Sequence, residues 1–331
     1  MGLTIRDVAR VAGVSTATVS RALRGLENVD PATRDRIVSI AREMQFSVSP
    51  VASRLATGRA GTIGIVTPFI ARWYFTEVFA GVEEGLQPFD VNLILHSTGR
   101  GTSPVHPVRA HERMRRRVDG ILVIGLPASL ATAEGLLGLD VPVVLLGSCS
   151  PGMSSVSIDD RLGARTAVEH LIEHGHERIG LISGEPLPTV FVPENDRLAG
   201  YLDALARHGL PTDEALREPG YFAVRGGERA METLLALRPR PTAVFCMSDE
   251  TAFGAMHTMS RQGLTPGRDI AIVGFDGHDL AEAFDLSTVA QPVRDLGRLA
   301  ARQLMDLVGG STNAEVTVLP TTLHARGSSG C

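Results

Sequence analysis

The sequence predicts an α/β protein with an all-helical N-terminal headpiece and a larger, two-lobed body of doubly wound parallel sheets. Residues 3–23 contain two short helical patterns separated by a turn signal. From residue 62 onward, short apolar runs alternate with amphipathic helical stretches, which is typical of parallel sheets with right-handed crossovers. A chain of 331 residues has room for two or three domains, and these alternating elements fit two lobes better than one.

The first helix is predicted to begin after Thr4, which can cap it, with Asp7 as a shortened capping-box partner. Apolar residues recur at helical spacing from Ile5 to Ala12, so one face is expected to be buried. Gly13 ends this helix because a glycine readily adopts the left-handed conformation of a C-cap.

The second helix is predicted over 16–23, with Ser15 as its N-cap and Val19, Ala22 and Leu23 as its buried stripe. Two such helices form a helix-turn-helix, whose second helix places its exposed residues in the major groove of DNA. Small side chains allow contact with thymine methyl groups, an arginine reaches a guanine edge or a phosphate, and short hydroxyls suit phosphates. The candidate DNA-contacting residues here are Thr4, Ser15, Thr16, Ala17, Thr18, Ser20 and Arg21.

A third helix is predicted from Asp30 as N-cap and Pro31 in the first turn, with arginines on its solvated face. The charge distribution argues against the alternative of an ordinary helix pair in a core. Residues 1–60 contain nine Arg and five acidic residues (net +4), whereas 61–331 contain 23 Arg and 32 acidic residues (net −9). A basic head on an acidic body is typical of a nucleic-acid-binding module joined to a separate domain.

Composition excludes several function classes. The hydrophobic fraction of 44% is ample for a core, yet no run of 18 apolar residues predicts a membrane span and no signal-peptide pattern opens the chain. Cys149, Cys246 and Cys331 are too few and too scattered for a disulfide framework or a zinc site. The chain has no lysine, which excludes a P-loop or a Schiff-base lysine. We therefore expect a cytoplasmic protein without a metal, a cofactor or a membrane partner.

The body is predicted to alternate strands with helices. The expected strands are 62–67, 91–96, 120–124, 141–146, 155–158, 179–183, 243–246, 270–275 and 316–319. Expected helices between them include 75–86, 161–174, 195–208, 227–237 and 249–262. Ligands of such folds bind beyond the carboxyl ends of the strands, so the loops after the strands are the places for a site.

The headpiece resembles that of the LacI/GalR family of bacterial repressors, on the segments TIRDVARVAGVSTATVSRAL and VDPATRDRIVSIAREMQF. The segment SPVASRLATG at 49–58 resembles the hinge helix of that family, although Val48 replaces the usual proline and Pro50 follows two residues later. In the family, paired hinge helices enter the minor groove and a leucine wedges open the central base step. The resemblance implies that Leu55 is this wedge, with Ser53 and Arg54 beside it in the groove.

The body resembles the same family on TIGIVTP, VSIDDRLGARTAVEHLIEHGHERIGLISG, FCMSDETAFGAM and DIAIVGFDGHDLAEAFDLSTVAQPV. The resemblance implies the two-lobed fold of periplasmic sugar-binding proteins, crossed near 159–163, 289–292 and 318–322. The implied domains are a headpiece (1–47), a hinge helix and linker (48–60), a body (61–323) and a flexible tail (324–331). Lobe one would comprise 62–160 and 291–318, and lobe two would comprise 161–290.

Effector-binding residues are implied at strand-end loops, where the family carries an arginine, an asparagine–aspartate pair, an aspartate and sometimes a glutamine. The matching residues here are Arg197, Ser248, Asp249, Asp276 and Gln291. A carboxylate opposite an arginine suits vicinal hydroxyls. Aromatic residues near the expected cleft could stack on a sugar face, and they are Phe69, Trp73, Phe75 and Phe222. Ser248 departs from the usual asparagine, and RWYF at 72–75 departs from the usual Asn-Pro-Phe-Phe.

Each of these residues has a structural alternative. Arg197 could pair with Glu194 or Asp196, Trp73 could belong to the core, and Asp276 could cap a turn with Gly277. For Asp249 we favour capping of its own helix over ligand contact. His170, His174 and His176 lack the Cys or paired carboxylate that would complete a metal site. The adjacent pairs Asp159–Asp160 and Glu83–Glu84 do not face each other, so no catalytic residues are expected.

These patterns together predict a sequence-specific DNA-binding repressor, not an enzyme, that acts as a homodimer on a pseudo-palindromic operator. A small polar effector, expected to be a sugar or sugar derivative, would bind between the lobes and control operator affinity. No leucine heptads follow residue 323, so a dimer is expected rather than a tetramer. The alternatives are a cytoplasmic solute-binding protein and a regulator that uses a nucleobase-type co-repressor.

Overall fold

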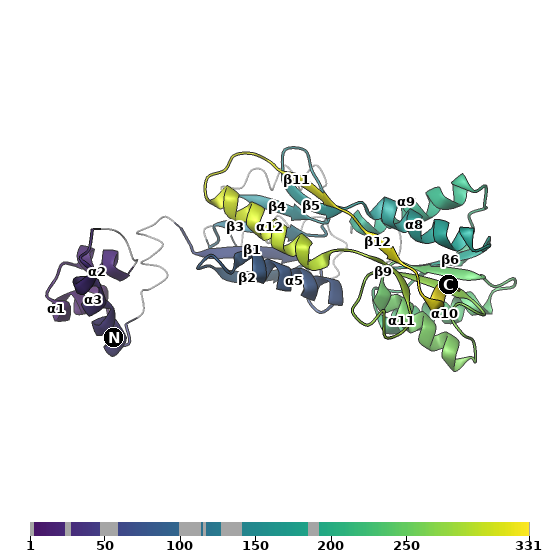
Figure 1. The fold of residues 1–331 in the computed structure, drawn as a ribbon, viewed down its shortest axis with the longest axis horizontal. Coiled ribbons are helices and arrows are strands. Elements are labelled where there is room, and N and C mark those ends of the chain that lie inside the picture. The colour runs from purple at the N-terminus through teal and green to yellow at the C-terminus, as the bar shows by residue number, and fades with distance from the viewer. Residues whose placement is uncertain are drawn as a thin grey trace. The chain divides into compact units, whose positions relative to one another are not determined.

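The computed structural model describes residues 3–23, 28–46, 59–98, 114, 117–126, 141–184 and 192–330. The chain divides into two compact units, Met1–Gly61 and Thr62–Cys331. The first unit is the helical headpiece and the second is the α/β body (Figure 1).

The described headpiece contains helices α1 (Ile5–Ala12), α2 (Thr16–Leu23) and α3 (Pro31–Glu43). Their caps are those that the sequence predicts. The Asp7 carboxylate accepts hydrogen bonds from the Thr4 amide at 3.0 Å and from the Thr4 hydroxyl at 2.8 Å. Gly13 ends α1 in the left-handed conformation, with φ of 66°. The Ser15 hydroxyl accepts from the Thr18 amide at 3.1 Å and so caps α2.

The three headpiece helices are held together by one small apolar core. Helices of eight residues are marginal by themselves, so α1 and α2 depend on this packing. The Arg36 guanidinium adds a link from α3 by donating to the carbonyl of Ala12, at the end of α1, at 3.1 Å. The buried apolar residues are Val8, Ala9, Ala12, Val19, Ala22, Ile37 and Ala41.

The described body contains two six-stranded sheets, which define its two lobes (Figure 1). The sheet of lobe one has the order β11-β5-β4-β3-β1-β2, and that of lobe two has the order β12-β10-β9-β8-β6-β7. All neighbouring strands pair in parallel except β10 and β12. The strands of lobe one are β1 (Thr62–Thr67), β2 (Asn92–Ser97), β3 (Gly120–Ile124), β4 (Val143–Leu146), β5 (Ser154–Ile158) and β11 (Val316–Leu319). Those of lobe two are β6 (Ile179–Ser183), β7 (Arg217–Pro219), β8 (Ala243–Cys246), β9 (Ala271–Asp276), β10 (Ser287–Ala290) and β12 (Thr322–His324).

Helices cover the sheets because the strands are apolar on both faces; every residue of β1, β3, β4, β6, β8 and β9 is buried. Lobe one carries α5 (Trp73–Leu86) and α12 (Val293–Val308). Lobe two carries α8 (Asp160–Glu173), α9 (Val192–Arg207), α10 (Val224–Ala236) and α11 (Asp249–Arg261), with the short helices η1 (Glu214–Leu216) and η2 (Gly327–Ser329).

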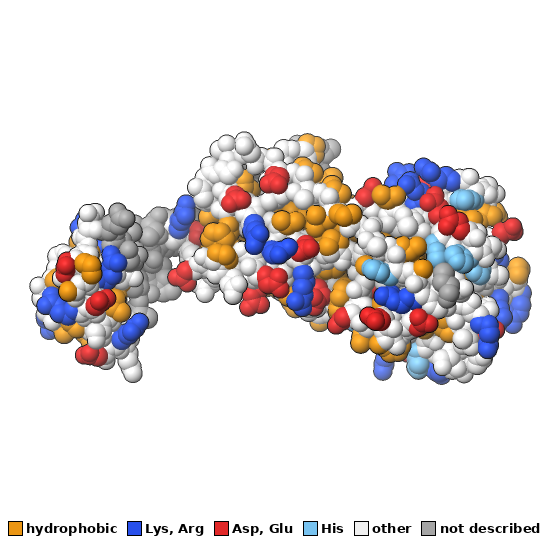
Figure 2. Space-filling model, in the orientation of Figure 1, with side chains coloured by type: hydrophobic (Ala, Val, Ile, Leu, Met, Phe, Trp, Pro, Cys, Tyr) orange, Lys and Arg blue, Asp and Glu red, His pale blue; other side chains and the backbone are white. Residues whose placement is uncertain are grey.

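Helices α5 and α12 lie side by side and approach very closely (Figure 1). A Cβ atom at Gly81 of α5 would lie 2.1 Å from the Arg294 carbonyl oxygen, and one at Gly297 of α12 would lie 2.2 Å from that of Val78. Glycine is therefore required on both helices. Arg294 Nε lies 2.6 Å from the Glu77 carboxylate and so links the two helices. Figure 2 shows acidic and basic side chains mixed over the visible face of the molecule.

The chain passes between the two sheets after β5, after β10 and after β11. The last crossing ends in a structured segment, which corrects the expectation of a flexible tail over 324–331. The Ser328 hydroxyl donates to the Ile272 carbonyl at 2.7 Å and accepts from the Ser287 amide at 2.8 Å. Ser329 is buried as well. A segment rich in Gly and Ser is usually flexible, but here the small residues fit into lobe two. The Ser328 hydroxyl satisfies backbone groups that would otherwise be buried without a hydrogen bond.

None of the helices in the described ranges combines the length and the apolar character needed to cross a membrane.

Candidate functional site

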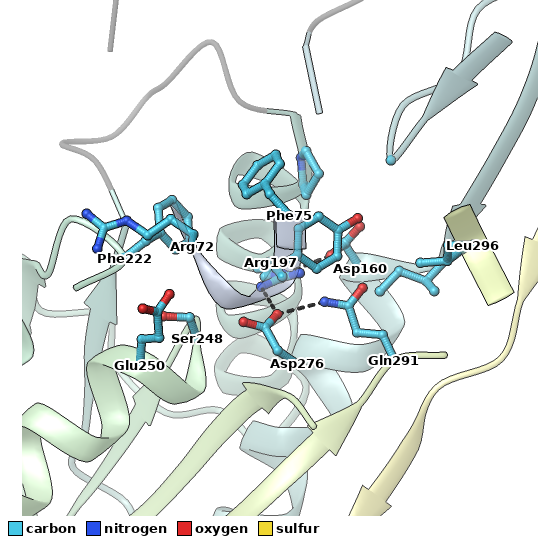
Figure 3. Close-up of a pocket in the computed structure, with 14 residues that line it drawn as sticks. Arg72, Phe75, Asp160, Arg197, Phe222, Ser248, Glu250, Asp276, Gln291 and Leu296 are labelled. Carbon is cyan, nitrogen blue, oxygen red and sulfur yellow. Dashed lines mark hydrogen bonds and ion pairs between the residues drawn. The ribbon is translucent and has the colours of Figure 1, made fainter. Parts of the chain in front are cut away.

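A cavity lies between the lobes at the carboxyl ends of the strands (Figure 3). Lobe one contributes side chains from the start of α5, from the end of β5 and from α12. Lobe two contributes side chains from the starts of α9 and α11 and from the end of β9. The described lining residues are Arg72, Tyr74, Phe75, Gly147, Ile158, Asp160, Pro193, Arg197, Phe222, Ser248, Glu250, Asp276, Gln291 and Leu296.

Arg197 is the centre of the polar part of this cavity (Figure 3). Its side chain is buried, and its Nε donates to the Asp160 carboxylate at 2.8 Å. Its Nη1 donates to the Met247 carbonyl at 2.5 Å and lies 3.4 Å from the Asp276 carboxylate. The guanidinium also lies 3.8 Å above the ring of Phe275. The arginine pairs with these two aspartates rather than with Glu194 or Asp196.

Asp276 joins this arginine to Gln291. The Gln291 side-chain amide donates to the Asp276 carboxylate at 2.7 Å, and its backbone amide donates to the Asp276 carbonyl at 3.2 Å. Asp276 has φ of 119°, a strained conformation for a residue other than glycine, at the point where β9 ends. Strain of this kind is common at binding sites, where the surrounding structure holds a side chain in place.

One guanidinium lies between two buried carboxylates, so the group has an excess of negative charge. Burial raises the pKa of Asp160 to about 6, against the lowering effect of Arg197. Burial likewise raises the pKa of Asp276 to about 7, with Arg197 and Gln291 lowering it. The two carboxylates interact, so they titrate as a pair above the ordinary range of an aspartate.

The opposite walls of the cavity are aromatic and aliphatic. Phe75 of lobe one and Phe222 of lobe two line it together with Tyr74 (Figure 3). Phe222 and its neighbour Tyr221 both have positive φ, 49° and 56°, so this loop is held in a conformation that side chains rarely adopt. A polar floor opposite an apolar wall suits a ligand with hydroxyl groups on one side and a carbon surface on the other.

Three residues predicted to bind an effector lie outside this lining. Asp249 is fully buried; its carboxylate accepts from the Thr288 hydroxyl at 2.7 Å and from the His278 amide at 2.7 Å. Asp249 is not the cap of α11 either, because the side chain of Ser248 caps that helix through the Thr251 amide at 3.3 Å.

The other two are aromatic. Phe69 packs edge-to-face against Phe75 and Phe222, with centroid distances of 5.5 Å and 6.3 Å. Trp73 stacks on His278, outside the cavity lining. Both residues therefore support the cavity wall or its rim rather than its interior.

The predicted DNA-contacting face of α2 is exposed. Ser15, Thr16, Ala17 and Arg21 are exposed, whereas Val19 and Ala22 are buried. Thr18 and Ser20 are partly buried, and the Thr18 hydroxyl lies 2.9 Å from that of Ser15. The predicted hinge residues Ser53, Arg54 and Leu55 lie outside the described residues.

The three histidines of α8 and the turn after it make local hydrogen bonds. His170 Nε2 lies 2.9 Å from the Ser329 hydroxyl, His174 Nδ1 lies 2.7 Å from the His170 carbonyl, and His176 Nδ1 lies 3.2 Å from the Thr242 hydroxyl. Among the residues that the structure describes, no group of three or more His, Cys, Asp or Glu side chains could hold a metal ion.

Comparison with known proteins identifies both units. A family model described as bacterial regulatory proteins, lacI family, matches residues 4–49, and one described as a periplasmic binding protein-like domain matches residues 168–329. The HTH-type transcriptional repressor CytR of Escherichia coli (strain K12) is 35% identical over 320 residues, which cover 93% of this chain and 90% of CytR. The chain belongs to the LacI family.

Solved structures of LacI-family proteins have the same fold. The Lac repressor dimer bound to operator and the anti-inducer ONPF superposes with a TM-score of 0.86 at 26% identity, over 99% of each chain. The complex of the transcriptional regulator CelR with cellobiose gives a TM-score of 0.71 at 31% identity, over 99% of this chain and 100% of that chain. The predicted architecture of a helical headpiece and a two-lobed α/β body is therefore confirmed.

Within this LacI-family body, sequence reasoning missed several cavity residues, above all Asp160, Arg72, Tyr74 and Glu250. Asp160 is not among the predicted effector-binding residues, because its pair with the adjacent Asp159 does not predict two carboxylates that face each other. It nevertheless lies just beyond the end of β5, after Asp159, so the strand-end rule that indicates Asp276 also applies to it. Asp159 is the residue that caps α8, accepting from the Leu162 amide at 2.8 Å, which leaves Asp160 to face Arg197.

Proposed function

We propose that this chain is a sequence-specific DNA-binding transcriptional repressor whose operator affinity is controlled by a small polar effector in the cavity between the lobes. One observation supports this most strongly: a headpiece with an exposed reading face and a body with a polar cavity occur in the same chain. The repressor would act in the cytoplasm as a homodimer, since a two-fold protein reads the two half-sites of a pseudo-palindromic operator.

The cavity supports a sugar or sugar derivative as the effector. Arg197 offers donors, and Asp160 and Asp276 offer acceptors, to the hydroxyl groups of one face of such a ligand. Phe75 and Phe222 offer an apolar surface to the other face. The similar regulator CelR was solved as a complex with cellobiose, a carbohydrate, which supports this choice of ligand class.

Control of DNA binding would come from the lobes. An effector that binds one lobe arrangement better than another shifts the equilibrium between them by its differential affinity. The hinge segment with Ser53, Arg54 and Leu55 would fold on DNA only when lobe one of each subunit is suitably placed, because so short a helix is marginal by itself. We expect a sugar-like inducer to lower the affinity for the operator, so that the repressor releases it when the inducer binds.

A regulator with a nucleobase-type co-repressor is the second candidate. The observation that favours it is the pair of phenylalanine rings from opposite lobes, which could enclose a flat heterocycle. The exposed face of α2, which is suited to contact DNA, argues against a solute-binding protein without a regulatory role.

The experiment has two stages. Selection from random duplex DNA with the full-length protein should return a pseudo-palindromic sequence, and a variant with Arg21→Ala should bind it more weakly. A thermal-shift screen of sugars, nucleosides and purines then identifies the effector, because a ligand of the folded state raises Tm. Enrichment of no common sequence would contradict the DNA-binding proposal. An effector that leaves operator affinity unchanged would contradict the control mechanism.

A further inference from the structure

The described walls of the cavity contain more carboxylates than cations. Asp160, Glu250 and Asp276 line it, against Arg72 and Arg197 (Figure 3). A fourth carboxyl group, that of Asp249, lies between the lining residues Ser248 and Glu250 in the sequence and is fully buried, and burial together with the nearby Asp276 raises its pKa well above the ordinary value. The formal charge of the lining is therefore negative when all of these groups are ionised.

Both cations already have partners in the structure. Arg197 is engaged by two carboxylates and one carbonyl. Arg72 donates to the Tyr221 carbonyl, across the cleft, at 3.3 Å, and it lies close enough to Glu250 to lower the pKa of that carboxyl. An anionic ligand would have to compete with these groups for each guanidinium.

Two of the helices that begin at the cavity, α8 and α11, have acidic residues at their N-termini. An N-terminus attracts anions through its unpaired amides and its dipole. Helix α8 begins at Asp160, and α11 begins at Asp249 and Glu250, so each of these ends already carries acidic side chains of the chain itself. Their negative charges complement the dipoles of the two helices.

The pKa values of the cavity carboxyl groups agree with this excess of carboxylates. Burial raises the pKa of Asp160, Asp249, Glu250 and Asp276, and neighbouring carboxylates add to the rise at Asp249 and Asp276. Like charges placed next to each other in a buried site repel each other strongly. A neutral polyol meets no such repulsion, because its hydroxyl groups donate to these same oxygens.

We infer that this cavity selects an effector without an anionic group and rejects phosphorylated and carboxylated analogues, through Asp160, Glu250 and Asp276. This inference rests on the proposed function, since it concerns the effector that the repressor senses. It narrows the class of ligand to uncharged sugars and nucleosides. Glu250 is the residue that sets selection at the rim, because it is only partly buried and is not paired with Arg197.

The test uses matched pairs of probes with the full-length protein: glucose and glucose 6-phosphate, ribose and ribose 5-phosphate, glucose and glucuronate, cytidine and its 5′-monophosphate. Binding is measured by thermal shift and calorimetry at constant ionic strength. For each pair in which a member binds, the neutral member should bind at least about tenfold more tightly. A charged member that binds as tightly as its neutral partner overturns the inference.

A second measurement needs no effector. The Tm of the full-length protein is measured in inorganic phosphate and in chloride at equal ionic strength. The difference in Tm between the two salts should be the same for the wild type and for Arg72→Gln. A phosphate-dependent rise that is lost in Arg72→Gln would reveal an anion site in the cavity and overturn the inference.

Variants separate the charge effect from general damage. Glu250→Gln should reduce the preference for the neutral member of each pair, whereas Glu232→Gln, an exposed acid on α10 of the same lobe, should leave it unchanged. Selection of operator DNA is measured on the same protein. If charge selection holds but no operator is found, the proposed function fails and the inference stands as a property of the cavity.

Discussion

The indole of Trp73 stacks on the imidazole of His278, with ring centroids 4.7 Å apart and planes inclined by 23°. Trp73 is the first residue of α5 in lobe one, and His278 follows β9 in lobe two, so the stack joins the lobes across the cleft. His278 is also faced by Phe253 of α11, at 5.2 Å between centroids, and by the charges of Asp279 and Glu77. The rim of the cavity thus has an aromatic contact that joins the two lobes.

The chain has one tryptophan, so its fluorescence reports this contact directly. Burial lowers the pKa of His278 below 6.5, and Asp279 and Glu77 oppose this. A histidine with a lowered pKa in the folded state stabilises it least at low pH, so the contact should weaken as the pH falls below about 6.5. Tryptophan emission should therefore change with a midpoint below pH 6.5. The change should vanish in His278→Phe and persist in His208→Ala, an exposed histidine; a step retained in His278→Phe would assign it to another group.

Arg197→Ala should strongly destabilise the body. The variant leaves the Asp160 and Asp276 carboxylates buried without their cation, and removal of one partner of a buried ion pair costs about 3–5 kcal/mol. Urea unfolding at pH 7.5 measures the loss. Arg225→Ala, on the exposed face of α10, should change the free energy of unfolding by less than about 0.5 kcal/mol. Equal effects of the two variants would show that the buried pairs add no stability.

Asp276→Asn should become relatively more stable than the wild type as the pH rises. The pKa of Asp276 is raised from 3.8 to about 7 in the folded state, so its stabilising contribution is full below pH 3.8 and is lost as the pH rises through about 7. The free energy of unfolding of the variant minus that of the wild type should increase between pH 5 and pH 8. Asp269→Asn is the control, because the pKa of Asp269 is lowered and its difference should be constant over this range.

Leu55→Ala should weaken operator binding by at least about tenfold while leaving effector binding intact, because an apolar wedge is needed to hold open a base step. This prediction rests on the resemblance of 49–58 to a hinge helix. Anisotropy with the selected operator and the thermal shift with the effector are the two readouts. Leu162→Ala, an exposed leucine on α8, should affect neither. Operator affinity at the wild-type level in Leu55→Ala would refute the hinge assignment.

Ser328→Ala should cost about 1–3 kcal/mol of stability, because it leaves the buried Ser287 amide and the Ile272 carbonyl without their shared partner. Ser260→Ala, on the exposed end of α11, is the matched control and should be close to neutral. A neutral Ser328→Ala would indicate that water replaces the hydroxyl, and that the end of the chain is less firmly held than its contacts suggest.

The caps of the headpiece helices and part of the polar cavity lining could be predicted from the sequence. These caps are local: they depend on backbone geometry over three or four residues, so they can be predicted before the fold is known. They are the Thr4–Asp7 capping box, the Ser15 cap and the end of α1 at Gly13. Arg197, Ser248, Asp276 and Gln291 were identified because parallel strands bring their carboxyl ends to one edge, and family resemblance marked the same positions.

Which side chains pair could not be predicted before the fold was known. Asp160 accepts a hydrogen bond from Arg197, which is 37 residues away in the sequence. Trp73 stacks on His278 instead of lining the cavity. Ser328 is buried, although a segment of its composition is usually flexible. The physical reason is that these contacts depend on how helices and strand-end loops are spaced after packing. Local propensity determines where an element begins and ends, whereas a partner far along the chain is selected by burial and by the need to satisfy buried polar groups.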